Sequence, residues 1–311
     1  MYIGVDVGGT NLVAALVTPE GCILERARRP TCAERDSSAI VTDISELIEQ
    51  VSAGFQEQVK SVGIGIPGVA DSQTGRVIRT PNMPFDGLPL AGMLDVRYPV
   101  FLGNDANAAA LGEYVAGAAQ GVSSMVMVTL GTGVGGGIVV DGNIVEGVGG
   151  AAAEIGHMVL CRDGLLCSCG RRGCFEMYAS ARALIRQTKE AFDEHPDSLM
   201  REEMGDPPHI SGRTAFSAAR RGDAVAQSVV DGYLDWLAEG LLNIIMILQP
   251  EIICIGGGIS GEGDTLLEPL RTRIHARRFC DGVRQTELAV ARLGNDAGLI
   301  GAAFLGNLGG R

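Results

Sequence analysis

The chain has 311 residues, 46% of them hydrophobic and 20% charged, with a formal net charge of −12 at pH 7. This length exceeds that at which a single core usually stops growing, so we expect two domains, and the apolar content excludes a disordered chain. The acidic charge argues against nucleic acid and anionic membranes as partners, because both require a basic surface. Eight cysteines are too sparse for a disulfide scaffold. The N-terminus has no signal-peptide pattern, so we expect a cytoplasmic location.

Short apolar segments bounded by glycine and proline predict strands, in chain order, at 2–7, 12–17, 23–24, 62–66, 100–102, 125–130, 136–140 and 252–255. Apolar residues at helical spacing predict an amphipathic helix after Ser38 with its apolar face running from Ile40 to Val59, and further helices at 106–115 and 229–248. The segment 125–140 repeats the strand, glycine turn and strand of 2–17. A polar, proline-containing stretch at 193–212 is interpreted as a variable insertion.

Three glycine-rich turns follow apolar strands. Their residues are Gly8, Gly9, Thr10 and Asn11 after Asp6; Gly131, Thr132 and Gly133; and Gly256, Gly257 and Gly258. A single such turn is typical of an ordinary hairpin, but three at strand ends favour nucleotide binding, because glycine lets backbone amides approach phosphate oxygens. Asp6 is placed to hold a metal-bound water. None of the turns has the sequence of a P-loop or of a dinucleotide fold.

A carboxylate lies between two amides where the strand at 100–102 meets the next helix. Asn104 and Asp105 there are typical of a helix N-cap, which is one interpretation of the pair. The other is that Asp105 removes a proton from a substrate hydroxyl while Asn104 holds a neighbouring hydroxyl, as phosphoryl transfer requires. Asn82, between two prolines, is a turn residue that could also reach substrate.

Residues 154–176 contain a group of metal-ligand types. His157, Cys167, Cys169 and Cys174 form a set of three thiols and one imidazole that suits structural zinc, although Cys161 could replace His157. Glu154 and Glu176 flank the set and are either surface charges or ligands for vicinal sugar hydroxyls. The other four cysteines are predicted to be small buried side chains, at positions 22, 32, 254 and 280.

Together these motifs resemble the ROK family of sugar kinases and sugar-responsive repressors, within the hexokinase/actin-like ATPase superfamily. The matching segments span nearly the whole chain, at 6–10, 65–68, 104–107, 130–137, 154–157, 167–176, 256–258, 294–298 and 301–303. The most specific are Glu154-Ile-Gly-His157 and the CxCGxxGC pattern that begins at Cys167. One departure is Asn11, where many members carry lysine, which puts a cationic phosphate contact in doubt.

The resemblance implies an α/β fold of two actin-like, ribonuclease H-like lobes, each with a mixed sheet. The N-terminal lobe would comprise 1–116 and a returning helix at 297–311, and the C-terminal lobe 117–296 with a zinc-stapled loop at 157–174. It implies ATP with Mg²⁺ as cofactors and structural Zn²⁺. It also implies a homodimer or homotetramer.

The resemblance also implies roles for single residues. Asp105 would be the catalytic base, and sugar contacts would come from Asn104, Glu154, His157 and Glu176, with Gly68 and Asn82 as weaker contacts. Zinc would be bound by His157, Cys167, Cys169 and Cys174.

The activity expected from these residues is ATP-dependent phosphorylation of a hexose at its 6-hydroxyl, with glucose as the expected sugar. Fructose, allose, mannose or N-acetylmannosamine are alternative substrates. A sugar-sensing repressor is the alternative from another class. Repressors of the family carry a DNA-binding domain before the first glycine turn, for which a turn beginning at Asp6 leaves no room, and the acidic charge offers no other DNA-binding surface.

Overall fold

The structure is a computed structural model that describes residues 1–81, 83–205 and 208–307. Tertiary contacts divide the chain into two compact units. One contains Met1–Met127, Gly136–Ala153 and Ala291–Arg311, and the other contains Val128–Gly135 and Glu154–Val290. The contacts therefore group 136–153 with the N-terminal residues, whereas the sequence analysis assigned this segment to the C-terminal lobe. The lobe boundaries at 116/117 and 296/297 stay a prediction.

The first unit is built on a five-stranded sheet in the order β3-β2-β1-β4-β7. Its strands are β1 (Tyr2–Val7), β2 (Asn11–Val17), β3 (Ile23–Pro30), β4 (Ser61–Ile66) and β7 (Val100–Asn104). β1, β2 and β3 form the predicted antiparallel meander, whereas β1, β4 and β7 run parallel. The carboxyl ends of these three parallel strands therefore meet at one edge of the sheet. A two-stranded ribbon consists of β5 (Val69–Asp71) and β6 (Arg76–Arg79).

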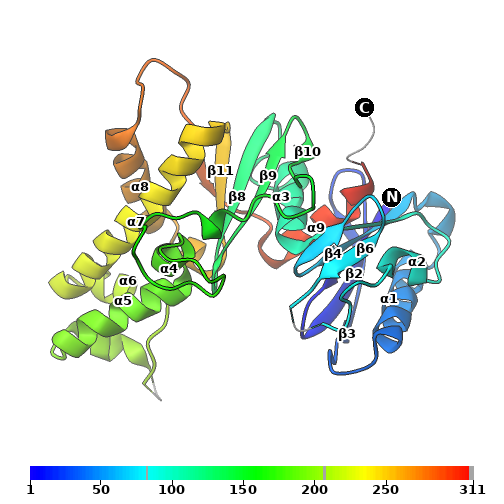
Figure 1. The fold of residues 1–311 in the computed structure, drawn as a ribbon, viewed down its shortest axis with the longest axis horizontal. Coiled ribbons are helices and arrows are strands. Elements are labelled where there is room, and N and C mark those ends of the chain that lie inside the picture. The colour runs from blue at the N-terminus through cyan, green and yellow to red at the C-terminus, as the bar shows by residue number, and fades with distance from the viewer. Residues whose placement is uncertain (82, 206–207, 308–311) are drawn as a thin grey trace. The chain divides into compact units, whose positions relative to one another are not determined.

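Helices cover both faces of this sheet. They are α1 (Ser37–Ser52), α2 (Leu90–Met93), α3 (Asp105–Ala116) and α9 (Ala297–Ala303), with 3-10 turns η1 (Gln56–Gln58), η5 (Gly294–Asp296) and η6 (Leu305–Asn307). The apolar stripe of α1 packs on one face with β1, β2 and β4 in a continuous core. α9 contacts β1, β2, β4 and α3 on the other (Figure 1). This packing places the start of α3 at the sheet edge where the parallel strands end.

A second five-stranded sheet has the order β10-β9-β8-β11-β12, which repeats the order of the first. Its strands are β8 (Ser124–Leu130), β9 (Val134–Val140), β10 (Asn143–Ile144), β11 (Ile252–Gly256) and β12 (Glu287–Val290). The repeat predicted from the strand-turn-strand pattern at 125–140 thus extends to the whole sheet. The second set of helices is α4 (Glu176–Ala179), α5 (Ala181–Glu194), α6 (Thr214–Arg220), α7 (Ala224–Leu248) and α8 (Asp264–Arg277), with 3-10 turns η2 (Ile155–His157), η3 (Leu199–Met204) and η4 (Gly258–Glu262).

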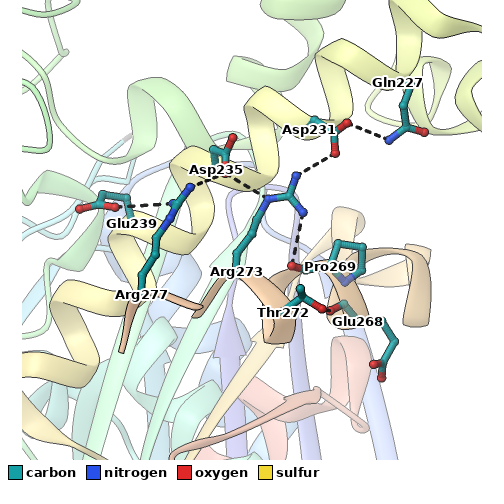
Figure 2. A network of polar contacts seen from close by, with 9 residues as sticks. All are labelled: Gln227, Asp231, Asp235, Glu239, Glu268, Pro269, Thr272, Arg273 and Arg277. Carbon is teal, nitrogen blue, oxygen red and sulfur yellow. Dashed lines mark hydrogen bonds and ion pairs between the residues drawn. The ribbon is translucent and has the colours of Figure 1, made fainter. Parts of the chain in front are cut away.

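A ladder of ion pairs joins α7 and α8 (Figure 2). Arg273 bridges Asp231 at 2.8 Å and Asp235 at 3.1 Å, and Arg277 bridges Asp235 at 2.8 Å and Glu239 at 3.8 Å. The three acids lie four residues apart on α7, so they form one stripe on the helix. Exposed pairs contribute only about 0–1 kcal/mol each, so the ladder fixes the register of α8 on α7 more than it stabilises the fold.

The structure confirms the α/β class with mixed sheets and the strands and helices predicted from residue patterns, with the following corrections. The returning helix expected at 297–311 ends at Ala303 as α9 and is followed by the 3-10 turn η6, while 308–311 lie outside the described residues. α1 ends at Ser52 and not near Val59, because Gly54 takes φ +82° and stops the helix. β3 extends from Ile23 to Pro30, well beyond the predicted 23–24. Of the four cysteines predicted to be buried, only Cys254 is, since those at 22, 32 and 280 are exposed. Among the described residues, no helix combines the length and hydropathy needed to cross a bilayer.

Candidate active site

Three of the predicted site residues of the first unit lie at one edge of its sheet. Asp6 near the end of β1 is in register with Gly65 on β4, and Ile66 on β4 is in register with Asn104 at the end of β7. Asp105 is the first residue of α3. Parallel pairing thus brings together residues that are far apart in the sequence.

Asn104 caps α3 and also ties two loops together. Its Oδ1 accepts the backbone amides of Ala106 at 2.8 Å and Asn107 at 3.0 Å, and its Nδ2 donates to the carbonyl of Gly68 at 2.8 Å. The N-cap interpretation is therefore confirmed. The second N–H of the amide donates to no acceptor among the described residues. Gly68 has φ +101°, and a Cβ there would lie 2.2 Å from the carbonyl oxygen of Arg79, so only glycine fits.

Asp6 and Asp105 are electrostatically coupled. Burial, and after it the negative charge of Asp105, raises the pKa of Asp6 to about 6 from its ordinary value of 3.8. The Oδ1 of Asp105 lies 2.8 Å from the amide of Ala106, within the first turn of α3, where a carboxylate is favoured by the helix dipole. A carboxyl group whose pKa is raised by burial and by a second carboxylate at the same sheet edge marks a candidate functional site.

The turn between β1 and β2 borders a cavity of about 750 Å³. The lining includes Gly8, Gly9, Thr10, Asn11, Arg26 and Arg28. Arg26 forms an ion pair with Asp296 at 2.7 Å, so its charge is partly compensated. Asn11 brings no charge, and the positive charge of this cavity comes from the two arginines of β3. Both arginines lie beyond 23–24, the part of that strand that the sequence predicts.

In the second unit, two further glycine turns meet at the end of β8. A Cβ on Gly257, which has φ +84°, would lie 2.4 Å from the carbonyl oxygen of Leu130, so the loop after β11 packs directly on the end of β8. A Cβ on Gly133 would lie 2.5 Å from Oε2 of Glu176. The glycine turn at 131–133 therefore contacts the carboxylate that follows the cysteine pattern, and the exposed Thr132 lies between the two glycines.

The ligand atoms of His157, Cys167, Cys169 and Cys174 all lie within 4.8 Å of one another. Nδ1 of His157 is 3.6 Å from Sγ of Cys167, and the Sγ atoms of Cys169 and Cys174 are 3.7 Å apart. Tetrahedral Zn–S bonds of about 2.3 Å place neighbouring sulfurs about 3.8 Å apart, so this spacing fits zinc. Cys161 is not in this group of four, which favours His157 as the fourth ligand.

The protonation of the thiols also fits a cation. Burial, followed by a hydrogen bond from its Sγ to Oε1 of Glu176 at 3.0 Å, raises the pKa of Cys167 to about 12. A buried thiol of this kind becomes a thiolate when a divalent ion compensates its charge. The four residues form a donor set that could hold a structural zinc ion.

His157 presents its two ring nitrogens to different groups. Nδ1 lies among the ligand atoms and 3.7 Å from Oε1 of Glu176, whereas Nε2 is 4.0 Å from Oε2 of Glu154. The side chain of Glu154 is 62% exposed and that of Glu176 is 17% exposed. One nitrogen can therefore bind metal while the other orients a carboxylate or a substrate hydroxyl. Asn82, the remaining predicted contact, lies outside the described residues.

The matching order of the two sheets, with glycine turns and carboxylates at strand ends, defines an α/β protein of the actin-like ATPase class. The profile of the ROK family matches residues 2–307, and the chain belongs to this family. It is 41% identical to a glucokinase of Thermotoga maritima over 306 residues, which cover 97% of this chain and 96% of the relative. A putative xylose repressor of a Caldicellulosiruptor species is 32% identical, over 98% of this chain and 77% of the repressor.

Among solved structures, the fold is similar to that of a ROK family glucokinase from Streptomyces griseus in complex with glucose and AMPPNP. The TM-score is 0.78 at 38% sequence identity, and the match covers 98% of each chain. The family and the fold expected from the sequence are thereby confirmed.

Proposed function

We propose that this protein is an ATP-dependent glucokinase that transfers the γ-phosphoryl group of ATP to the 6-hydroxyl of glucose. The observation that carries the proposal is the carboxylate of Asp105, which lies at the same sheet edge as Asp6, near the end of the strand that leads into the Gly8–Asn11 turn. Phosphoryl transfer needs such a base beside a phosphate-binding turn. The identity with glucokinases, at about 40%, supports glucose as the acceptor.

In the proposed reaction, Asp105 accepts the proton of the glucose 6-hydroxyl as that oxygen attacks the γ-phosphorus of ATP. The new O–P bond forms while the bond between the γ-phosphorus and the bridging oxygen breaks, and ADP leaves with the electron pair. Backbone amides of the glycine turns at 8–11, 131–133 and 256–258 hold the phosphates. Asp6 would hold the Mg²⁺ that accompanies ATP, and the ion would shield the negative charge of the transferred phosphoryl group.

Sugar recognition is assigned to Asn104, Glu154, His157 and Glu176, with Gly68 and Asn82 as further contacts. Carboxylates suit this role because each can accept hydrogen bonds from two adjacent sugar hydroxyls. The contact of Glu176 with Cys167 and His157 supports a zinc cluster that fixes this carboxylate.

A coupled assay of ADP release with a panel of hexoses tests the proposal. We expect glucose to give the highest kcat/KM, with glucose 6-phosphate as the product. A clear preference for fructose, allose, mannose or N-acetylmannosamine would contradict the choice of sugar and leave the class of reaction intact. No sugar-dependent ADP release from any hexose would contradict the kinase itself.

A sugar-sensing regulator is the second candidate, since a protein named as a putative xylose repressor is related at 32% identity. The higher identity with glucokinases and the presence of Asp105 at the phosphate-binding edge favour the enzyme. Sugar binding without turnover, together with retention of a DNA probe, would favour the regulator.

We further propose that the protein forms a homodimer or homotetramer in the cytoplasm. Apolar side chains that stay exposed support association of subunits, with Ile247 at the end of α7 75% exposed and Phe279 after α8 89% exposed. Light scattering on the purified chain measures the assembly directly, and a monomer at micromolar concentration would contradict it.

A further inference from the structure

A single threonine lies directly behind the first glycine turn. Thr31 follows β3 and is fully buried, at 0% exposure. Its hydroxyl donates to the carbonyl of Gly8 at 2.6 Å, and its backbone amide donates to the carbonyl of Thr10 at 2.9 Å. One residue therefore engages carbonyls on both sides of the turn.

These bonds set the direction in which the amides of the turn point. Because a trans peptide is planar, a Gly8 carbonyl that faces Thr31 directs the amide of Gly9, in the same peptide, to the opposite side. The amide of Gly8 closes the turn on the carbonyl of Asn11 at 3.0 Å. Within the described part of the chain, the amides of Gly9 and Thr10 donate to no protein acceptor. They remain for a ligand in the adjacent cavity, which Gly9 and Thr10 both line.

Thr31 is itself held by a charged network beneath the turn. Nη2 of Arg35 donates to the Thr31 carbonyl at 2.9 Å and to Asp43 at 2.5 Å. Asp43 lies on α1, and its other carboxylate oxygen accepts from Arg29 at 2.5 Å. Although burial alone would raise the pKa of Asp43, hydrogen bonds from the two arginines hold it below its ordinary value, so this anchor stays charged. A continuous chain of bonds runs from α1 through Thr31 to the turn.

We infer that Thr31 is a positioning residue for nucleotide binding: its hydroxyl holds the Gly8–Gly9 peptide so that the amides of the turn face the terminal phosphates of ATP. The inference rests on the proposed function, which places ATP at this turn. The β- and γ-phosphates are assigned to this turn because Asp6 and Asp105 lie at the same sheet edge, and the proposed function places phosphoryl transfer beside these two carboxylates. Thr31 does not touch the substrate, and its effect is carried by the orientation of the turn.

The test is isothermal titration of Mg²⁺-AMPPNP and of AMP into the Thr31→Val protein. Valine keeps the shape and removes one hydrogen bond, so we expect AMPPNP to bind about tenfold more weakly. AMP lacks the β- and γ-phosphates, and its Kd should change by less than about twofold, within the error of such comparisons. In the kinase assay, KM for ATP rises while KM for glucose is unchanged. In Thr31→Ser, which retains the hydroxyl, the Kd for AMPPNP and the KM for ATP should both be close to those of the wild type.

Thr188→Val is the matched control. Thr188 is also 0% exposed and donates its hydroxyl to a backbone carbonyl, that of Leu184 at 2.7 Å, but this bond lies within α5 and involves no residue of a glycine turn. The Thr188→Val protein should lose stability as Thr31→Val does, but its affinity for AMPPNP should equal that of the wild type. If Thr31→Val does not fold, Arg35→Met takes its place. This change removes the hydrogen bond to the Thr31 carbonyl at a partly exposed position, and we expect the Kd for AMPPNP to rise about threefold.

The inference is overturned if Thr31→Val or, in its place, Arg35→Met binds AMPPNP as tightly as the wild type. It is also overturned if AMP affinity falls as much as AMPPNP affinity, because that result indicates general distortion. These outcomes leave the proposed function standing when the wild type binds AMPPNP and phosphorylates glucose. Failure of the wild type to bind AMPPNP would instead overturn both the proposed function and this inference.

Discussion

Replacement of one cysteine of the metal cluster should remove zinc and weaken sugar binding together. In Cys169→Ser the cluster loses one of its four zinc ligands, so zinc is lost. The positive charge of the ion then no longer stabilises the buried thiolates. Glu176 then loses its fixed neighbours, since its Oε1 lies 3.0 Å from Sγ of Cys167 and 3.7 Å from Nδ1 of His157. Loss of one charge-assisted hydrogen bond to the sugar costs about 1.5–3 kcal/mol, which is roughly a 10- to 150-fold rise in the Kd for glucose.

The assay combines zinc content by atomic absorption with glucose titration monitored by tryptophan fluorescence. Trp236 is the only tryptophan of the chain, and its ring centroid lies 4.4 Å from that of Tyr178 on α4, two residues after Glu176. The hydroxyl of Tyr178 also accepts the amide of Leu165 within the cysteine loop. Fluorescence therefore reports on the segment that the cluster holds.

Cys161→Ser is the control, because Cys161 lies in the same loop but outside the group of four ligands. It should keep one zinc per chain and wild-type affinity for glucose. Loss of zinc in Cys161→Ser would show that the ligand set is wrong. Loss of zinc in Cys169→Ser with an unchanged Kd for glucose would refute the link between the cluster and the sugar.

Three further predictions concern the first unit. Burial and the charge of Asp105 raise the pKa of Asp6 to about 6, so ionised Asp6 destabilises the ligand-free protein above that pH. Asp6→Asn should therefore raise the urea midpoint at pH 8. This gain should vanish as the pH falls through 6 towards 4, where Asp6 is protonated. Glu113 is fully buried and accepts three backbone amides, so Glu113→Ala should lower the free energy of unfolding by at least about 3 kcal/mol, measured by chemical denaturation. In Gly68→Ala the new Cβ would clash with the Arg79 carbonyl and displace the loop whose Gly68 carbonyl accepts from Asn104. We therefore expect kcat to fall, and a wild-type kcat would contradict this.

Much of the fold follows from local signals in the sequence, and the exceptions have physical causes. The strand at 2–7 and the helix at 229–248 are apolar and bounded by turns. The strand has the predicted bounds, and the helix ends at Leu248 as predicted but begins earlier, at Ala224. β3 was predicted only at its start, because its remaining residues are largely charged and become a strand through pairing with β2. The helix after Ser38 was predicted too long, because its apolar spacing continues past the glycine that ends it.

The site was predictable in part for the same reason. Glycine turns and the cysteine pattern are local, and the sequence analysis found them. The coupling of Asp6 with Asp105 depends on the pairing of β1, β4 and β7, which no local pattern specifies. Thr31 carries no signal in the sequence at all, since a buried threonine after a charged strand resembles any loop residue. Its contact with the turn exists only in three dimensions.

The most direct test of the central claim is glucose phosphorylation by Asp105→Asn, measured as glucose 6-phosphate formed from ATP. Asparagine keeps the size of the side chain and cannot accept the proton of the 6-hydroxyl. We predict a fall in kcat of at least about 100-fold, because a general base usually contributes at least this factor to the rate. The Kd for glucose should stay within about threefold of wild type. Turnover close to that of the wild type would contradict the assignment of Asp105 as the catalytic base.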